Sequence, residues 1–241
     1  QVILTDFIRY EPAVGMDSAI DSLGAWPVFC ELVHTAELSD RPHLALLTGR
    51  IAVIHRSLEP VMAQYMPEAR FRDVAFSGDF VEVGGKLNEL TTTFTVLLQT
   101  GTIRALVGTR ALLGEGWDCP AVNSLILATA IGAFVMTNQM RGRAIRVDAA
   151  NINKTASIWH LAAIAPGLFS GISDYGSLAE RFQTFVGLHH EEPVIEGGIK
   201  RLGLPGLSAP LLGPALQFSV EANNTEMARR LEDDRDSLAE R

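Results

Sequence analysis

Through residues 1–165, apolar residues occur in short unbroken runs separated by glycine, proline and charged residues. Runs without alternating polar positions are typical of strands that a parallel sheet buries on both faces. The second and third runs are equally consistent with two short strands or with a single bent one. The predicted strands are Gln1–Ile8, Leu44–Leu47, Ile51–Ile54, Phe71–Phe76, Ile103–Val107, Ser124–Thr129 and Ala156–Ile164.

Between the strands, apolar residues recur every three or four positions, which is the spacing of helices with one buried face. Gly101 follows one such segment and is placed as its C-terminal stop. Alternating strands and helices predict parallel strands joined by right-handed crossovers, hence an α/β fold with helices on both faces of a mostly parallel sheet. The predicted helices are Trp26–Leu38, Arg56–Met66, Gly85–Thr100 and Phe134–Met140, with a loop at Tyr10–Leu23 and a turn at Ser77–Asp79.

Residues 166–241 follow a different pattern. A helix is predicted at Asp174–Gly187, and Gly197–Pro214 contains eight Gly or Pro among eighteen residues, which indicates a loop or linker. Thr225–Arg241 has the pattern of a charged helix. We therefore predict a domain at 1–165 and a helical and irregular C-terminal extension at 166–241. The chain starts directly on a strand without methionine, so we expect a piece of a longer polypeptide.

Hydrophobic residues make up 47% of the chain and charged residues 20%, the balance of a soluble globular protein. No charge-free apolar run of about 18 residues and no basic leader occurs, so no membrane span or signal peptide is predicted. Cys30 and Cys119 form no metal-binding spacing, and a cytoplasmic location is expected. The net charge of −8 argues against a broad basic surface, so any contact with nucleic acid must be a local track.

Glycines and polar residues follow the fifth predicted strand. Gly108, Thr109 and Arg110 interrupt the apolar run, and Gly116 and Asp118 precede the next one. Ligand-binding loops lie at the carboxyl ends of parallel strands, so Gly108, Thr109 and Asp118 are expected at that edge of the sheet.

Three arginines follow the helix predicted to begin at Phe134. Arg143 and Arg146 are three positions apart, so on a helix their guanidinium groups share one face. Guanidinium groups offer planar pairs of donors that match phosphate oxygens, and Gly142 lets a ligand come close. The cluster, which also contains Arg141, predicts a phosphate-binding segment.

These segments resemble two motifs of the superfamily 2 helicases and translocases, the DEAD/DEAH-type ATP motors that include restriction-enzyme motor subunits. The segment GTRALLGEGWD, from Gly108 to Asp118, is similar to motif V. The segment QMRGRAIR, from Gln139 to Arg146, matches every fixed position of motif VI, Q-x-x-G-R-x-x-R. Their order and separation are also those of the family. The resemblance implies that residues 1–165 form the second, C-terminal RecA-like motor domain.

The resemblance implies catalytic roles as well. Arg143 and Arg146 are expected to act as arginine fingers on the phosphates of ATP, and Gln139 to position the γ-phosphate or the attacking water. Asp118 is equally suited to cap the turn before Pro120. The residues expected to bind the cofactor are Gly116, Asp118 and Gly142.

A further set of residues is expected to contact nucleic acid. Thr109 and Arg110 begin motif V, which in the family touches the nucleic-acid backbone. Thr5 and Arg9 lie at the end of the first strand, where the match to motif IV is loose. Motif VI begins with Gln139 rather than with the histidine of DEAD-box RNA proteins, which favours DNA over RNA and translocation on a duplex.

The chain lacks the motifs that hold ATP. Gly84-Gly85-Lys86 is followed by Leu87 and has no glycine at the earlier required position, and no acidic box follows an apolar strand. ATP and Mg²⁺ are therefore expected to be held mainly by an N-terminal RecA-like domain of the same polypeptide. This chain alone is predicted to be inactive.

Other interpretations remain open at this stage. The chain could be a non-catalytic α/β module that binds nucleic acid or a protein, or a nucleotide-binding enzyme that does not touch nucleic acid. The arginine pair favours the motor, because a scaffold needs no phosphate-stabilising pair. Ser77 and Gly78 fit a turn as well as a phosphate contact. His189–Glu192 has no second ligand pair, so no metal site is predicted.

Overall fold

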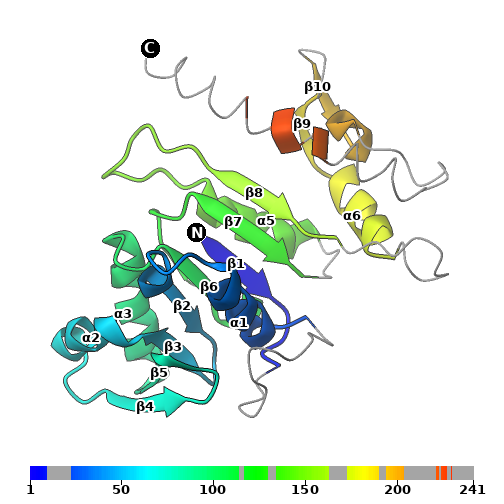
Figure 1. Ribbon diagram of the computed structural model, residues 1–241. Helices are drawn as coiled ribbons and strands as arrows, with labels where there is room; N and C mark the ends of the chain where they lie inside the picture. Colours follow the sequence, from blue (N-terminus) through cyan, green and yellow to red (C-terminus); the bar gives the residue numbers. More distant parts are fainter. Residues whose placement is uncertain are drawn as a thin grey trace. The chain divides into compact units, whose positions relative to one another are not determined.

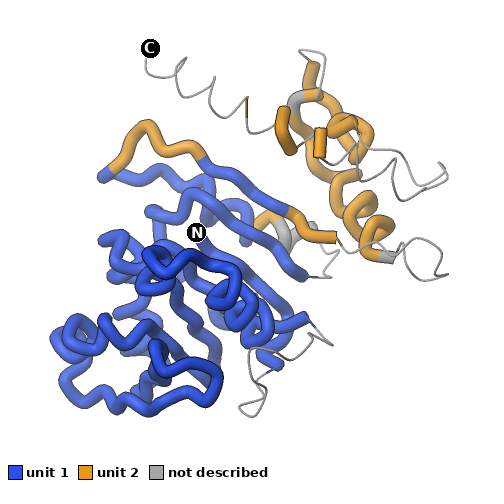
Figure 2. Tube along the Cα trace, in the orientation of Figure 1, with its two compact units in different colours: residues 1–129, 140–150, 156–159 blue, residues 130–139, 151–155, 160–241 orange. Residues whose placement is uncertain are grey.

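The computed structural model describes residues 1–9, 23–113, 117–129, 134–162, 173–189, 194–203, 221–222, 224–226 and 229. The described chain contains an eight-stranded mixed sheet with the strand order β4-β5-β3-β2-β6-β1-β7-β8, and a separate two-stranded sheet (Figure 1). It divides into two compact units (Figure 2). Unit 1 comprises 1–129, 140–150 and 156–159, and unit 2 comprises 130–139, 151–155 and 160–241.

Four parallel strands form the centre of the large sheet. β1 (Val2–Thr5) lies between β6 (Ala105–Thr109) and β7 (Ser124–Ala128), and β2 (Leu44–Leu47) pairs with the far side of β6. All residues of β1 and β2 are buried. The unbroken apolar runs therefore occur where both faces of the sheet are covered, as predicted.

The remaining strands on the β2 side are antiparallel, which the prediction of parallel strands did not anticipate. β3 (Ala52–His55) pairs antiparallel with β2 and with β5 (Ser77–Gly84), which in turn forms a hairpin with β4 (Arg70–Val74). β5 begins at Ser77, within the predicted turn. It alternates between faces: Phe80 enters the core on one side and Val83 the core on the other.

Helices cover both faces of the large sheet. Val2 and Leu4 contribute to one core, together with residues of α2, α3 and α5, whereas Ile3 contributes to a second core with α1. Figure 1 shows α1 in front of the central strands. The helices in and around the sheet are α1 (Ala25–Thr35), η1 (Arg41–His43), η2 (Arg56–Leu58), α2 (Glu59–Tyr65), α3 (Leu87–Gln99), α4 (Arg110–Leu113) and α5 (Phe134–Ala144).

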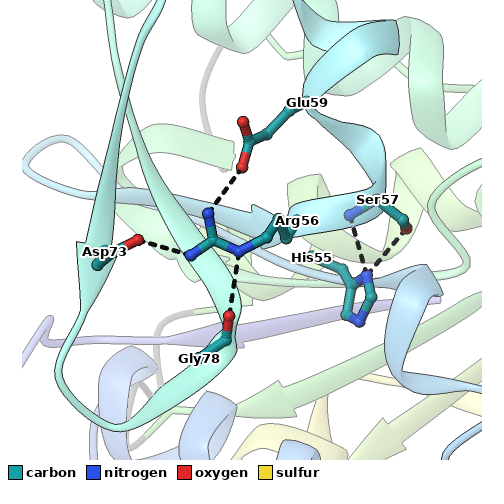
Figure 3. Close-up of polar contacts among 6 residues, drawn as sticks. All are labelled: His55, Arg56, Ser57, Glu59, Asp73 and Gly78. Carbon is teal, nitrogen blue, oxygen red and sulfur yellow. Dashed lines mark hydrogen bonds and ion pairs between the residues drawn. The ribbon is translucent and has the colours of Figure 1, made fainter.

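A network around Arg56 fastens the antiparallel edge (Figure 3). Its guanidinium group donates to the Asp73 carboxylate at 2.6 Å, to the Gly78 carbonyl oxygen at 3.1 Å and to the Glu59 carboxylate at 3.3 Å. One side chain thus joins η2, the beginning of α2 and both strands of the β4–β5 hairpin. Gly78 is part of this hairpin, and this structural role explains a glycine at position 78 without a contact to phosphate.

Unit 2 has its own small core of Tyr175, Leu178, Ala179, Phe182 and Ile199. α6 (Ser173–Gln183) supplies most of it, with the predicted buried face. β9 (Val186–Leu188), β10 (Ile195–Gly197) and η3 (Ile199–Leu202) follow, and β8 (Ser157–His160) lies at the edge of the large sheet. The predicted loop at Tyr10–Leu23 and the terminal helix lie almost wholly outside the described residues. Every described helix is too short or too polar to span a bilayer.

The end of α3 allows a test of the requirement for a left-handed backbone conformation at Gly101. Gly101 has a φ of +74°, and a Cβ there would meet nothing within 4 Å, so only the left-handed conformation demands glycine. Gly101→Ala is expected to lower the free energy of unfolding by about 1 kcal/mol in urea denaturation. Gly49→Ala is the control, because Gly49 has the same open surroundings without a positive φ. Equal losses in both variants would contradict this explanation.

Candidate functional site

The carboxyl ends of β1 and β6 bring two predicted nucleic-acid contacts together. Thr5 pairs with Thr109 in the sheet register, and their exposed fractions are 0% and 5%. The Thr5 hydroxyl donates to the carbonyl oxygen of Phe7 at 3.0 Å. The Thr5 side chain therefore holds the chain that follows β1, and the predicted contact of Thr5 with nucleic acid stays a prediction.

An ion pair joins the ends of the same two strands. Arg110 Nε lies 3.3 Å from Asp6 Oδ1, with 25% of the Arg110 side chain and 14% of the Asp6 side chain exposed. Arg110 is the first residue of the short helix α4. The partly buried pair fixes the start of motif V beside the end of β1. Only part of the guanidinium surface is thus available to a ligand.

Arg9 lies near this edge. The carbon of its guanidinium group is 4.9 Å from the centroid of the Phe7 ring, so the cation lies over one face of the aromatic ring. Arg9 is exposed, and so is 58% of Phe7. The structure therefore keeps Arg9 at the surface, where a phosphate can reach it.

The end of the segment that resembles motif V lies at the opposite edge of the sheet, which corrects the predicted location of Asp118 at the carboxyl ends of the strands. Trp117 Nε1 donates to Thr95 Oγ1 at 2.8 Å, near the C-terminal end of α3, which precedes the start of β6. Cys119 is buried in the same core as Val2, the first residue of β1, and the segment leads into β7, which begins at Ser124 and runs parallel to β1. Trp117 and Cys119 therefore place Asp118 at the amino ends of the parallel strands. Gly116 lies outside the described residues.

Asp118 forms an ion pair with Arg146 of motif VI. The two side chains are 53% and 47% exposed, so solvent screens the interaction. α5 ends at Ala144, so Arg146 lies beyond the helix, and the prediction that Arg143 and Arg146 share a helical face is wrong. A tertiary contact with Asp118 instead sets the position of Arg146.

The other residues of the segment that resembles motif VI, up to Ala144, lie on α5. Gln139 is exposed, Arg143 is half-buried, and burial lowers the pKa of Arg141. A Cβ built at Gly142 would meet nothing within 4 Å, so the glycine is not needed for packing within this chain. Gly142 therefore leaves open space on a helix that carries arginines on both sides of it, as a binding segment for an anion requires.

A serine–histidine pair elsewhere has a structural role. His55 Nδ1 is 2.9 Å from the Ser57 hydroxyl and accepts the Ser57 backbone N–H at 3.2 Å (Figure 3). Burial lowers the pKa of His55, which keeps the ring neutral so that Nδ1 can accept. The ring thus caps η2. We assign no nucleophilic chemistry to this pair.

Within the described residues, no group of three or more His, Cys, Asp or Glu side chains has the arrangement of a metal site. His189 Nε2 lies 3.8 Å from the carboxylate of Glu196. Residues 190–193 of the histidine–glutamate cluster lie outside the described part.

Comparisons with known proteins identify no relative of this chain. No family model, no curated protein and no solved structure matches the chain.

Sequence reasoning missed two contributors. Phe7 was read as part of an apolar strand, although β1 ends at Thr5. In the sequence, Trp117 stands out only as part of the segment that resembles motif V, although its indole anchors the loop to Thr95. The turn after Thr5 has no clear sequence signal. A hydrogen bond between Trp117 and Thr95 depends on tertiary structure.

The two ion pairs are expected to differ in strength. A double-mutant cycle with Asp6→Asn and Arg110→Gln should give a coupling energy of about 1 kcal/mol in the free energy of unfolding, because that pair is largely shielded from solvent. The matched cycle with Asp118→Asn and Arg146→Gln should give less than about 0.5 kcal/mol, because that pair is half exposed. The reverse order would contradict the assignment of Asp6–Arg110 as the structural pair.

Proposed function

We propose that this chain is the C-terminal, RecA-like motor domain of an ATP-dependent superfamily 2 DNA helicase or translocase. The observation that carries the proposal is the ion pair between Asp118, at the end of the motif V segment, and Arg146, at the end of the motif VI segment. The two segments are far apart in sequence, and motor chemistry requires both at one nucleotide. Their side chains meet in the folded chain.

The chemistry requires positive charge at the phosphates. In phosphoryl transfer the transition state spreads negative charge over the oxygens of the γ-phosphate, and an arginine finger stabilises that charge. Arg143 and Arg146 would supply it, with Gln139 to position the phosphate or the water. Since a half-exposed ion pair contributes about 1 kcal/mol or less, a phosphate can take the place of Asp118 as the partner of Arg146.

The cofactor would be ATP with Mg²⁺, held mainly by an N-terminal RecA-like domain. The open space at Gly142 and the arginines on both sides of it support an approach of the phosphates to α5. Asp118 orients Arg146 before the nucleotide arrives. In this proposal the ATP-binding site is formed mainly by another domain, and residues of this chain complete it.

The positions of the two residue sets support coupling between ATP and the track. Thr5, Thr109 and Arg110 lie at the carboxyl ends of the central strands, and Asp118 lies at the amino ends. The two described parts of the motif V segment, 108–113 and 117–118, lie at opposite edges of the sheet. A change at the nucleotide could therefore alter the contacts of Arg110 through one continuous stretch of chain.

The overall charge limits the kind of track. With a net charge of −8, the protein would bind DNA through a narrow set of contacts. Of the predicted residues Thr5, Arg9, Thr109 and Arg110, the two arginines have side chains at the surface, whereas Thr5 and Thr109 are 0% and 5% exposed. Backbone amides and hydroxyl groups would contribute beside the two arginines. DNA is favoured over RNA by the glutamine at the start of motif VI.

The arginine fingers are tested in the full-length protein. Arg143→Ala and Arg146→Ala are each expected to lower ATP turnover by about 10³-fold or more while nucleotide binding stays largely intact, because the arginines act on the transition state. Turnover is measured with and without duplex DNA, single-stranded DNA and RNA. Arg50→Ala, an exposed arginine in the β2–β3 turn, is the control and should leave turnover unchanged.

Undiminished turnover in Arg143→Ala would remove the arginine-finger assignment. If the unmodified protein showed no turnover with any nucleic acid, the non-catalytic binding module would replace the motor. ATP turnover that no nucleic acid stimulates would indicate a nucleotide-binding enzyme without a track.

A further inference from the structure

Phe7 is a large aromatic residue that the fold leaves at the surface. It follows the fully buried strand β1 by two positions, and 58% of it is exposed. Within that strand, Val2, Ile3 and Leu4 are all at most 5% exposed. The change from core to surface is therefore abrupt, and it occurs at the carboxyl edge beside Arg110.

The backbone of Phe7 is firmly held. Its carbonyl oxygen accepts the Thr5 hydroxyl at 3.0 Å and the Ala25 amide at 2.9 Å, and the Ile8 carbonyl oxygen accepts the Trp26 amide at 2.9 Å. The strand end is thus docked on the first turn of α1. A side chain on so constrained a backbone loses little further freedom when it binds a ligand.

Arg9 adopts a conformation that keeps its cation on the ring. Its φ of +49° is in the left-handed region, which is uncommon for arginine. Gly24 makes room for it, since a Cβ at position 24 would lie 2.5 Å from Arg9 Cγ. The guanidinium group then lies 4.9 Å from the centroid of Phe7.

We propose that Phe7 and Arg9 form a stacking platform for an unpaired base of a single-stranded nucleic acid. The inference rests on the proposed function for the presence of a nucleic-acid track, and adds a contact with the base to contacts with the backbone. The exposed surface of the ring would stack on the base, and Arg9 would bring its charge to the adjoining phosphate. Bases within a duplex are already stacked on each other, so the platform requires an unpaired base. It therefore fits the helicase form of the proposed function and not the translocation on a duplex that the sequence favours.

The surroundings favour a nucleic acid over a protein partner. The cation of Arg9 lies against the exposed ring, and the Asp6 carboxylate is paired with Arg110, whereas a protein-docking face is apolar at its centre. Aromatic rings beside arginines are the usual means of holding single strands, because every base has a flat face. The pair also lies on the same edge as Thr109 and Arg110, the predicted backbone contacts.

The platform is tested by fluorescence anisotropy of a labelled oligo-dT strand titrated with the 241-residue chain at low salt. Phe7→Ala is expected to weaken binding about five- to a hundredfold, which is the usual effect of losing one stacked base. Phe7→Trp should restore binding. Tyr65→Ala is the matched control, because Tyr65 is an aromatic residue of α2 with 51% exposure and should leave binding unchanged.

A strand of equal length with abasic sites separates stacking from charge. Phe7→Ala should leave the affinity for this strand unchanged, whereas Arg9→Ala should weaken binding to both strands. A thermal melt of each variant checks folding, which truncation of the exposed ring should hardly affect. A duplex of the same length should bind more weakly than oligo-dT and show no effect of Phe7→Ala.

Four results would overturn the platform. These are no measurable binding of oligo-dT, equal losses in Phe7→Ala and Tyr65→Ala, an undiminished effect of Phe7→Ala on the abasic strand, and an equal effect of Phe7→Ala on the duplex. None of these results bears on the assignment of Arg143 and Arg146 as arginine fingers. ATP turnover of Arg143→Ala in the full-length protein decides the motor function separately.

Discussion

The burial of β1 between β6 and β7 is the constraint on which the structure depends. Alternate residues of this strand enter the cores on the two faces of the sheet, so a shift by one position would exchange them. The parallel register with both neighbours then fixes where each strand ends. The loops that follow Thr5 and Thr109 are adjacent for this reason, and the segment that leads into β7 returns to the other edge.

Three arginines of this acidic protein form ion pairs with carboxylates that the fold brings next to them. Arg110 is held by Asp6, Arg146 by Asp118, and Arg56 by Asp73 and Glu59. Of these pairs, Asp6–Arg110 is the one most shielded from water, and it joins the ends of two strands. Arg56 is as exposed as Arg146, but it makes three contacts at once and so joins η2, α2 and the β4–β5 hairpin. In the proposed function, a phosphate would take the place of Asp118 as the partner of Arg146.

The parts of the fold that could be predicted are those that local pattern determines. Buried runs identified β1, β6 and β7, helical spacing identified α1 and α3, and Gly101 marked the end of α3 correctly. β5 was missed because its alternating residues contain charges and follow a Ser-Gly-Asp sequence that also fits a turn. For the candidate site, the motif letters selected the segments, whose roles stay predictions. The edge on which Asp118 lies and the end of α5 before Arg146 depend on tertiary contacts that no local pattern encodes.

The junction of Phe7 and Ile8 with the first turn of α1 has a mechanical consequence. The junction consists of two hydrogen bonds between backbone atoms, so substitutions of side chains do not remove its donors or acceptors. A displacement of the chain at the end of β1 therefore acts on the start of α1, and a helix is stiff along its axis. α1 would carry that displacement as a rigid rod from Ala25 to Thr35 across one face of the sheet. The end of the central strand and a helix of the covering layer would then move as one body.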